Sequence, residues 1–186
     1  AAHDLNGDGF MDLVFANAFD GWGYTQYSYI YWGSSAGYSE TDREILSTVG
    51  ASAIAIGDLN GDSHPDLVFS NGQNGPTYNI DSYIYWGSAS GYSESDRSEL
   101  PTLGANDVKI ADLNGDSLPD LVFANGLTAD ADGNGVVDSG GATYEVDSYI
   151  YWGTATGYSE NDRSGLATMG TWGSEIADLD GDGFLD

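Results

Sequence analysis

The chain has 186 residues, with 4 Lys and Arg against 30 Asp and Glu, which gives a formal net charge of −26. This balance disfavours nucleic acid as a partner, because binding to phosphate requires a basic surface. The length is that of one domain, the chain contains no Cys, and no apolar run approaches the roughly 20 residues of a membrane-spanning helix. We therefore expect a single unit over residues 1–186 with no membrane insertion.

The first feature in chain order is an acidic nine-residue loop at 4–12 with the pattern D-x-[DN]-x-[DN]-[GS]-x-x-D. Copies follow at 58–66, 112–120 and 178–186, and a fifth lies off the main register at 130–138. Oxygen side chains at loop positions 1, 3 and 5 can converge on one point, position 7 can add a carbonyl, and position 9 can close the shell. Calcium takes six to eight oxygen ligands in this way, so we expect four to five calcium sites.

The expected ligands, with position 7 contributing its carbonyl, are Asp4, Asn6, Asp8, Phe10 and Asp12; Asp58, Asn60, Asp62, His64 and Asp66; Asp112, Asn114, Asp116, Leu118 and Asp120; Asp130, Asp132, Asn134, Val136 and Asp138; and Asp178, Asp180, Asp182, Phe184 and Asp186.

Two other interpretations of the loop are an EF-hand and a turn without metal. An EF-hand needs a carboxylate at position 12, but that position holds Phe15, Phe69 and Phe123. An Asx-rich turn without metal remains an alternative for any single copy. In the second and third copies Ser63 and Ser117 replace the Gly of position 6, where a left-handed backbone is expected, so these loops are predicted either to bind calcium more weakly or to take a slightly different turn.

Four short strands are predicted for each repeat. An apolar run follows each loop (13–16 in the first repeat), and then comes an aromatic stretch such as 28–32, both typical of strands. A weaker stretch near 99–103 contains a Pro, which suits an edge strand, and an Ala/Ile-rich stretch such as 53–56 leads into the next loop. We therefore predict an all-β fold of four-stranded antiparallel β-propeller blades. The Ala/Ile strand is expected innermost, the Pro-containing strand outermost, and the calcium loop between the innermost strand and the second.

The repeat length is about 54 residues. Asp4, Asp58 and Asp112 are each separated by 54 positions, whereas Asp178 follows after 66, because the third repeat carries a 12-residue insertion. The predicted repeats are 4–57, 58–111, 112–177 with the insertion within about 126–143, and 178–186 as the start of a fourth. Three repeats leave blade edges open, and exposed strand edges favour self-association or a larger propeller.

Three motifs together resemble the FG-GAP repeats of integrin α-subunit propellers and of bacterial proteins with FG-GAP or VCBS repeats. They are the acidic loop, the aromatic-Gly pairs 32–33, 86–87 and 152–153, and the Gly-Ala steps 50–51 and 104–105. The resemblance implies a propeller, usually of about seven blades, with calcium held in loops on one face.

Two sets of repeated side chains are expected to be structural. Arg43, Arg97 and Arg163 share one repeat position, and we expect each guanidinium to clamp a nearby carboxylate, such as the preceding Asp, or strand-end carbonyls; a ring of ligand-binding arginines is the alternative. The Tyr-x-Tyr-Trp stretch is expected to fill the space between blades rather than to stack on a sugar.

The sequence contains no recognisable catalytic set. We therefore expect a calcium-binding, extracellular or cell-surface module for adhesion or ligand binding, with calcium in a structural role. Its partner would be a protein or glycan bound on 17–27, 71–81 and 125–147, the loops in which the repeats differ most. Alternatives are a structural subunit of an extracellular filament or matrix and, less favoured, a domain of an enzyme that acts on polysaccharides.

Overall fold

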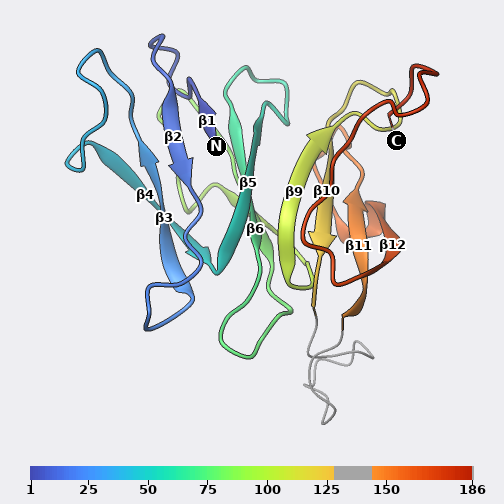
Figure 1. The fold of residues 1–186 in the computed structure, drawn as a ribbon. Coiled ribbons are helices and arrows are strands. Elements are labelled where there is room, and N and C mark those ends of the chain that lie inside the picture. The colour runs from blue at the N-terminus through green and yellow to red at the C-terminus, as the bar shows by residue number, and fades with distance from the viewer. Residues whose placement is uncertain (128–143, 186) are drawn as a thin grey trace.

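The computed structural model describes residues 1–127 and 144–185. In these two ranges, twelve strands form three four-stranded antiparallel sheets that stand side by side (Figure 1). The one helix among the described residues is a single 3-10 turn, Glu160–Asp162. The prediction of an all-β fold built from four-stranded blades is therefore confirmed.

The strands of each sheet follow one another in chain order from one edge to the other. The first sheet contains β1 (Ala2–His3), β2 (Asp12–Phe15), β3 (Thr25–Tyr31) and β4 (Arg43–Val49). The second contains β5 (Ala51–Gly57), β6 (Asp66–Asn71), β7 (Ser82–Tyr85) and β8 (Arg97–Leu100). The third contains β9 (Ala105–Ala111), β10 (Asp120–Asn125), β11 (Glu145–Tyr151) and β12 (Arg163–Met169).

The predicted positions of the strands within a blade agree with this order. The Ala/Ile-rich strands β5 and β9 lie next to each other and form the inner edge of their sheets. The weaker stretch is the outer edge strand, and β8 ends at Leu100, immediately before Pro101, as expected for a residue that cannot donate a ladder hydrogen bond. Phe15, Phe69 and Phe123 all lie in strands, which agrees with the rejection of an EF-hand.

Each sheet has two apolar faces, because alternate residues of a strand point to opposite sides. We call one the front face, which in the first sheet carries Leu13, Phe15, Tyr29 and Tyr31, and the other the back face, which carries Val14, Ile30 and Leu46. The back face of the first sheet packs on the front face of the second, where Leu67, Phe69 and Tyr85 are fully buried.

The back face of the second sheet packs in the same way on the front face of the third. Val68, Ile84 and Leu100 of the second sheet meet Leu121, Phe123 and Tyr151 of the third. At each junction a tyrosine hydroxyl also donates to a carbonyl in, or directly after, the outer strand of the preceding sheet: Tyr85 Oη to Ser47 O at 2.7 Å and Tyr151 Oη to Pro101 O at 2.6 Å. The aromatic stretch therefore fills the blade junctions, as expected.

The arginine expectation is met in part, because two of the three guanidinium groups pair with a nearby carboxylate: Arg97 with Glu99 at 2.5 Å and Arg163 with Glu160 at 3.5 Å. Each guanidinium lies over a tyrosine ring, with Arg97 Cζ 3.9 Å from the centroid of Tyr83, and none of the three forms an ion pair with the preceding Asp within the described residues. Strand register explains this, because Arg97 lies directly opposite Tyr85 across β7 and β8 and so shares a face with both tyrosines. Arg163 also donates to Pro101 O at 3.4 Å, which is one of the expected strand-end carbonyls.

The loops separate into two groups at opposite ends of the sheets (Figure 1). The acidic loops before β2, β6 and β10 lie at one end, together with the C-terminal part of the described chain, which contains the fourth acidic loop. The hairpin loops from β2 to β3 and from β6 to β7 lie at the other end. No helix in the described part of the chain is long and apolar enough to cross a membrane.

Candidate metal centres

The acidic loops connect the inner edge strand of each sheet to the second strand, as predicted. Four of the five expected copies fall within the described residues, apart from Asp186. The fifth, at 130–138, lies outside them, so its expected ligands Asp130, Asp132, Asn134, Val136 and Asp138 have no structural description.

In the first loop, side-chain oxygens at positions 1, 3 and 5 all accept hydrogen bonds from the loop backbone. Asp4 accepts from the amides of Asp8 at 3.1 Å and Gly9 at 2.9 Å, and Asn6 Oδ1 accepts from Asp8 N at 3.0 Å. Asp8 Oδ1 accepts from Phe10 N, the position-7 residue, at 2.8 Å. These bonds wrap the backbone around the side chains and hold the three residues on the same side of the loop.

The same hydrogen bonds recur in the other described copies. Asp58, Asp112 and Asp178 each accept from the amides of positions 4, 5 and 6, and the position-5 Asp accepts from the position-7 amide of His64, Leu118 or Phe184. In the fourth loop, carboxylate oxygens of Asp178, Asp180 and Asp182 lie within 4.8 Å of one another. Such a set of converging oxygens, with no nitrogen or sulfur donor, fits a hard divalent cation.

The position-9 Asp has an additional role that the sequence pattern did not indicate. Asp66 is fully buried, and its two carboxylate oxygens accept from Leu59 N at 2.8 Å and Gly87 N at 2.7 Å. Asp12 accepts the equivalent bonds from Leu5 N and Gly33 N. Asp120 accepts them from Leu113 N and Gly153 N. This residue ties the acidic loop to the Trp-Gly turn, and its expected role in closing the metal shell stays a prediction.

The environment of Asp66 is electrostatically costly without a cation. Burial raises the pKa of its carboxyl to about 6, with smaller contributions from the carboxylates of Asp62 and Asp58 and despite the two amide hydrogen bonds. At Asp62 itself the amide of His64 lowers the pKa. A cation among these groups would offset the repulsion between them.

The Ser residues at position 6 adopt the left-handed backbone that the pattern requires. Ser63 and Ser117 have φ of 71° and 70°, where Gly9 and Gly183 have 88° and 92°. Ser63 N still donates to Asp58 at 2.9 Å, the same distance as the Gly9 bond to Asp4. The substituted loops therefore keep the hydrogen bonds of the others in a conformation that is strained for Ser.

The Gly of each Trp-Gly pair lies where the turn approaches the acidic loop. A Cβ on Gly87 would meet Pro65 O at 2.2 Å, and one on Gly33 would meet Met11 O at 2.2 Å. Only Gly allows this approach, which brings its amide to the position-9 Asp. The aromatic-Gly motif and the acidic loop are thus two halves of one local structure.

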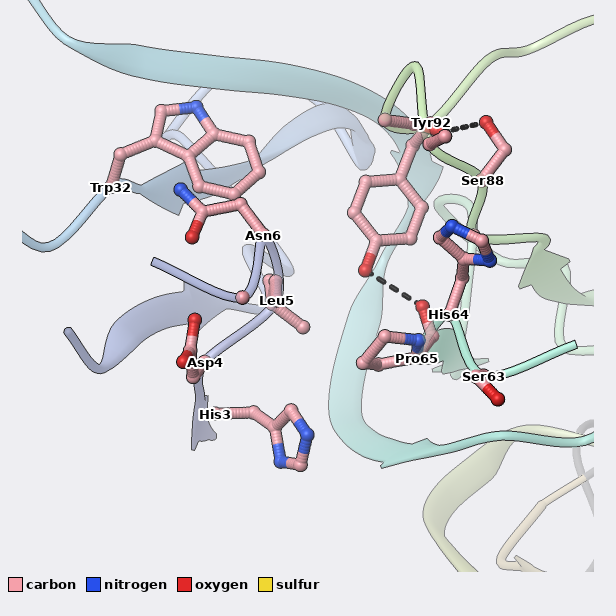
Figure 2. A pocket seen from close by; sticks show the side chains of 14 residues that line it. His3, Asp4, Leu5, Asn6, Trp32, Ser63, His64, Pro65, Ser88 and Tyr92 are labelled. Carbon is pink, nitrogen blue, oxygen red and sulfur yellow. Dashed lines mark hydrogen bonds between the residues drawn. The ribbon is translucent and has the colours of Figure 1, made fainter. Parts of the chain in front are cut away.

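A cavity of about 520 Å³ lies between the first two acidic loops (Figure 2). Trp32 and Asn6 lie on the side of the first sheet, and Tyr92, His64 and Pro65 lie on the side of the second. Tyr92 Oη donates to Pro65 O at 2.8 Å, which fixes that wall to the second loop.

Both histidines of the chain, His3 and His64, line this cavity. The corresponding residues at the junction of the second and third sheets are Gly57 and Leu118. Trp86 and Trp152 donate their indole N–H to Ser98 and Ser164, each at 2.9 Å, whereas Trp32 has Glu44 at that position and no described acceptor. The first junction is therefore chemically different from the second.

Three stacked four-stranded sheets with an acidic loop entering each define a repeat protein with propeller-like blades. The FG-GAP-like repeat family matches the chain twice, over residues 4–69 and 58–123, and the chain belongs to this family. Each match begins at one acidic loop and ends in the strand that follows the next acidic loop. Among curated proteins, none shows significant similarity to the chain. FG-GAP-like repeats are typically structural or binding modules of the extracellular type.

Proposed function

We propose that this chain is a calcium-stabilised extracellular or cell-surface module whose role is to bind a protein or glycan partner. The observation that carries the calcium part is the repeated loop geometry, with oxygens at positions 1, 3 and 5 held together by backbone amides in each described copy. Calcium in these loops would neutralise the carboxylates and link the inner edge strand to the second strand. An extracellular setting is consistent with this role, because calcium is scarce in the cytosol.

The partner surface that we propose is the end of the sheets opposite the acidic loops (Figure 1). The hairpin loop from β2 to β3 exposes Trp22 and Phe19, with 95% and 55% of their surface accessible. Asp20 accepts from the amides of Trp22 and Gly23 at 2.7 and 2.9 Å, so this part of the loop has a defined turn. Exposed aromatic side chains on a turn held in place are typical contact residues.

Isothermal titration with calcium tests the metal part. We expect about four to five sites per chain, and Asp8→Ala should remove one of them while leaving the others. A titration of the wild-type chain that shows no heat of binding at millimolar calcium would contradict the proposal.

A glycan array and a screen of extracellular proteins, both with calcium present, test the partner part. We expect a bound partner to be lost in Trp22→Ala and kept in Phe184→Ala, which removes an exposed aromatic side chain from the fourth acidic loop, away from the hairpin loops. A partner that binds both variants equally would contradict the proposed surface.

A further inference from the structure

Three of the acidic loops carry an Asn-Gly pair at positions 3 and 4, a dipeptide that is chemically reactive. The three pairs, each with an exposed Asn, are Asn6-Gly7, Asn60-Gly61 and Asn114-Gly115. Asn is a thermolabile residue, and a following Gly leaves its own backbone nitrogen accessible because it has no Cβ. That nitrogen can attack the carbonyl carbon of the Asn side chain, and the local fold decides which pair is able to react.

The attacking amide is free in the first loop and bonded in the next two. Gly61 N donates to Asp58 Oδ1 at 2.8 Å, and the third loop has the same bond at the same distance. Gly7 N has no such bond to Asp4 and no other acceptor among the residues that the structure describes. A hydrogen bond to a carboxylate keeps the proton on an amide and holds the nitrogen in place, so Gly7 has the most reactive nitrogen of the three.

Other Asn-Gly pairs in the described part of the chain serve as internal references. Asn71 is fully buried, its Nδ2 donates to a backbone carbonyl at 2.8 Å, and Gly72 N has a backbone acceptor at 2.9 Å. Asn125-Gly126 is held in the same way. Asn74-Gly75 has an exposed Asn and lies in the hairpin loop from β6 to β7, at the end of the sheet opposite the acidic loops.

We propose that Asn6 is a deamidation site and that calcium in the first loop controls its reaction. Gly7 N forms a bond to Asn6 Cγ, the Cγ–Nδ2 bond breaks, and Nδ2 leaves as ammonia with the proton from the Gly7 amide. Water then opens the cyclic imide. The sum is a side-chain amide and water giving a carboxyl group and ammonia, so no oxidant or reductant takes part.

The control by calcium comes from the way in which the loop holds the Asn6 side chain. Its Oδ1 accepts from Asp8 N at 3.0 Å, and its Nδ2 donates to Asp8 Oδ2 at 3.1 Å. Calcium would fix Oδ1 as a ligand, whereas in an empty loop the carboxylates of Asp4 and Asp8 repel each other and release the side chain. This step rests on the calcium sites of the proposed function.

The fourth loop indicates that the main chain accepts the product. It has Asp180 at position 3, and Asp182 N donates to Asp180 Oδ1 at 3.1 Å, the counterpart of the bond from Asp8 to Asn6. The product loop loses the amide donor to Asp8 and gains a negative charge, so its folding should depend more strongly on calcium. Opening of the imide at the main-chain carbonyl gives isoaspartate instead, which lengthens the loop backbone and disrupts these bonds.

The test is peptide mapping by mass spectrometry of the full chain after incubation with calcium or with a chelator. At a hundredfold excess of calcium over its dissociation constant about 1% of the first loops are empty, so Asn6 should react roughly a hundredfold more slowly than in chelator. Asn74 should react at the same rate in both conditions. Asn71 should stay intact, which shows that the chain remains folded.

Two variants make the comparison in calcium, where the other loops stay occupied. Asp8→Ala empties the first loop and Asp62→Ala empties the second. Asn6 in the first variant should react roughly tenfold faster than Asn60 in the second, which is the factor that one hydrogen bond to a charged group represents. Equal rates in the two variants would overturn the proposal, and so would an Asn6 that stays intact after Asn74 has reacted.

Failure of this proposal is distinguishable from failure of the proposed function. Equal rates at Asn6 in calcium and in chelator overturn the control by calcium if titration shows that the chain binds the ion. If the chain binds no calcium, the proposed function is contradicted, and a faster reaction at Asn6 than at Asn60 in the wild-type chain still supports the deamidation site.

Discussion

Single glycines control how the acidic loop and the Trp-Gly turn meet. Gly87 lies so close to the second loop that any Cβ would collide with the Pro65 carbonyl, and its amide is one of the two donors to buried Asp66. The motif is therefore a steric requirement combined with a hydrogen bond.

Gly87→Ala should lower the free energy of unfolding by about 3 kcal/mol, because the backbone must move and the bond to Asp66 weakens. For a chain of this size the melting temperature should fall by roughly 10 °C. Gly23→Ala is the control, since its Cβ would meet nothing closer than 4.0 Å. Equal melting temperatures for the two variants would refute the steric explanation.

Position 6 of the acidic loop gives a second prediction at the residue scale. Ser63 has a left-handed backbone that is unfavourable for any residue with a Cβ, so Ser63→Gly should stabilise the chain by about 1 kcal/mol and tighten calcium binding at that loop. Gly9→Ser is the reciprocal change, and it should destabilise the chain because Gly9 has the same left-handed backbone. The amount should be similar, since open space surrounds Gly9 and no steric clash adds to the cost. Chemical denaturation measures both, and two changes of the same sign would contradict the prediction.

At the scale of elements, the outer strands are held by arginines that lie over tyrosine rings. Arg97 covers Tyr83 and donates to Tyr85 Oη at 3.4 Å, which links β8 to β7. Arg97 side-chain exposure is 19%, whereas Arg43 of the first sheet is exposed. The same contact should therefore contribute more in the second sheet than in the first.

Arg97→Leu should cost about 1–2 kcal/mol of stability, as a partly desolvated cation–π contact does. Arg97→Lys should restore little, because an ammonium group cannot stack and donate as the planar guanidinium does. Arg43→Leu should have a smaller effect. Urea denaturation of the three variants gives the order, and a larger loss for Arg43→Leu would contradict it.

The sequence was sufficient to predict the elements, because each strand and loop recurs at a fixed spacing and with a clear residue pattern. It was also sufficient to predict the order of the strands within a blade, since Pro101 and the Ala/Ile stretch suit opposite edges. It did not indicate that Arg97 would lie over Tyr83, because that contact depends on the register between β7 and β8. The link that Asp66 makes between the acidic loop and the Trp-Gly turn was missed for the same reason, since its two amide donors are brought together only by folding.

At the scale of the whole molecule, the two ends of the sheets carry different groups of loops. The acidic loops gather at one end, where the proposed calcium ions would offset the repulsion among carboxylates. The variable hairpin loops occupy the other end (Figure 1), and the stacked apolar faces lie between them. Metal loss at one end should therefore destabilise the sheets on which the proposed partner surface depends.

The central claim is that calcium stabilises the folded chain through the acidic loops, and thermal unfolding with calcium and with a chelator tests it most directly. Binding to the folded state alone contributes about 2.7 kcal/mol for each site at a hundredfold excess over the dissociation constant. We therefore predict that the melting temperature is at least roughly 10 °C higher in calcium than in chelator. The same melting temperature in both conditions would contradict the account.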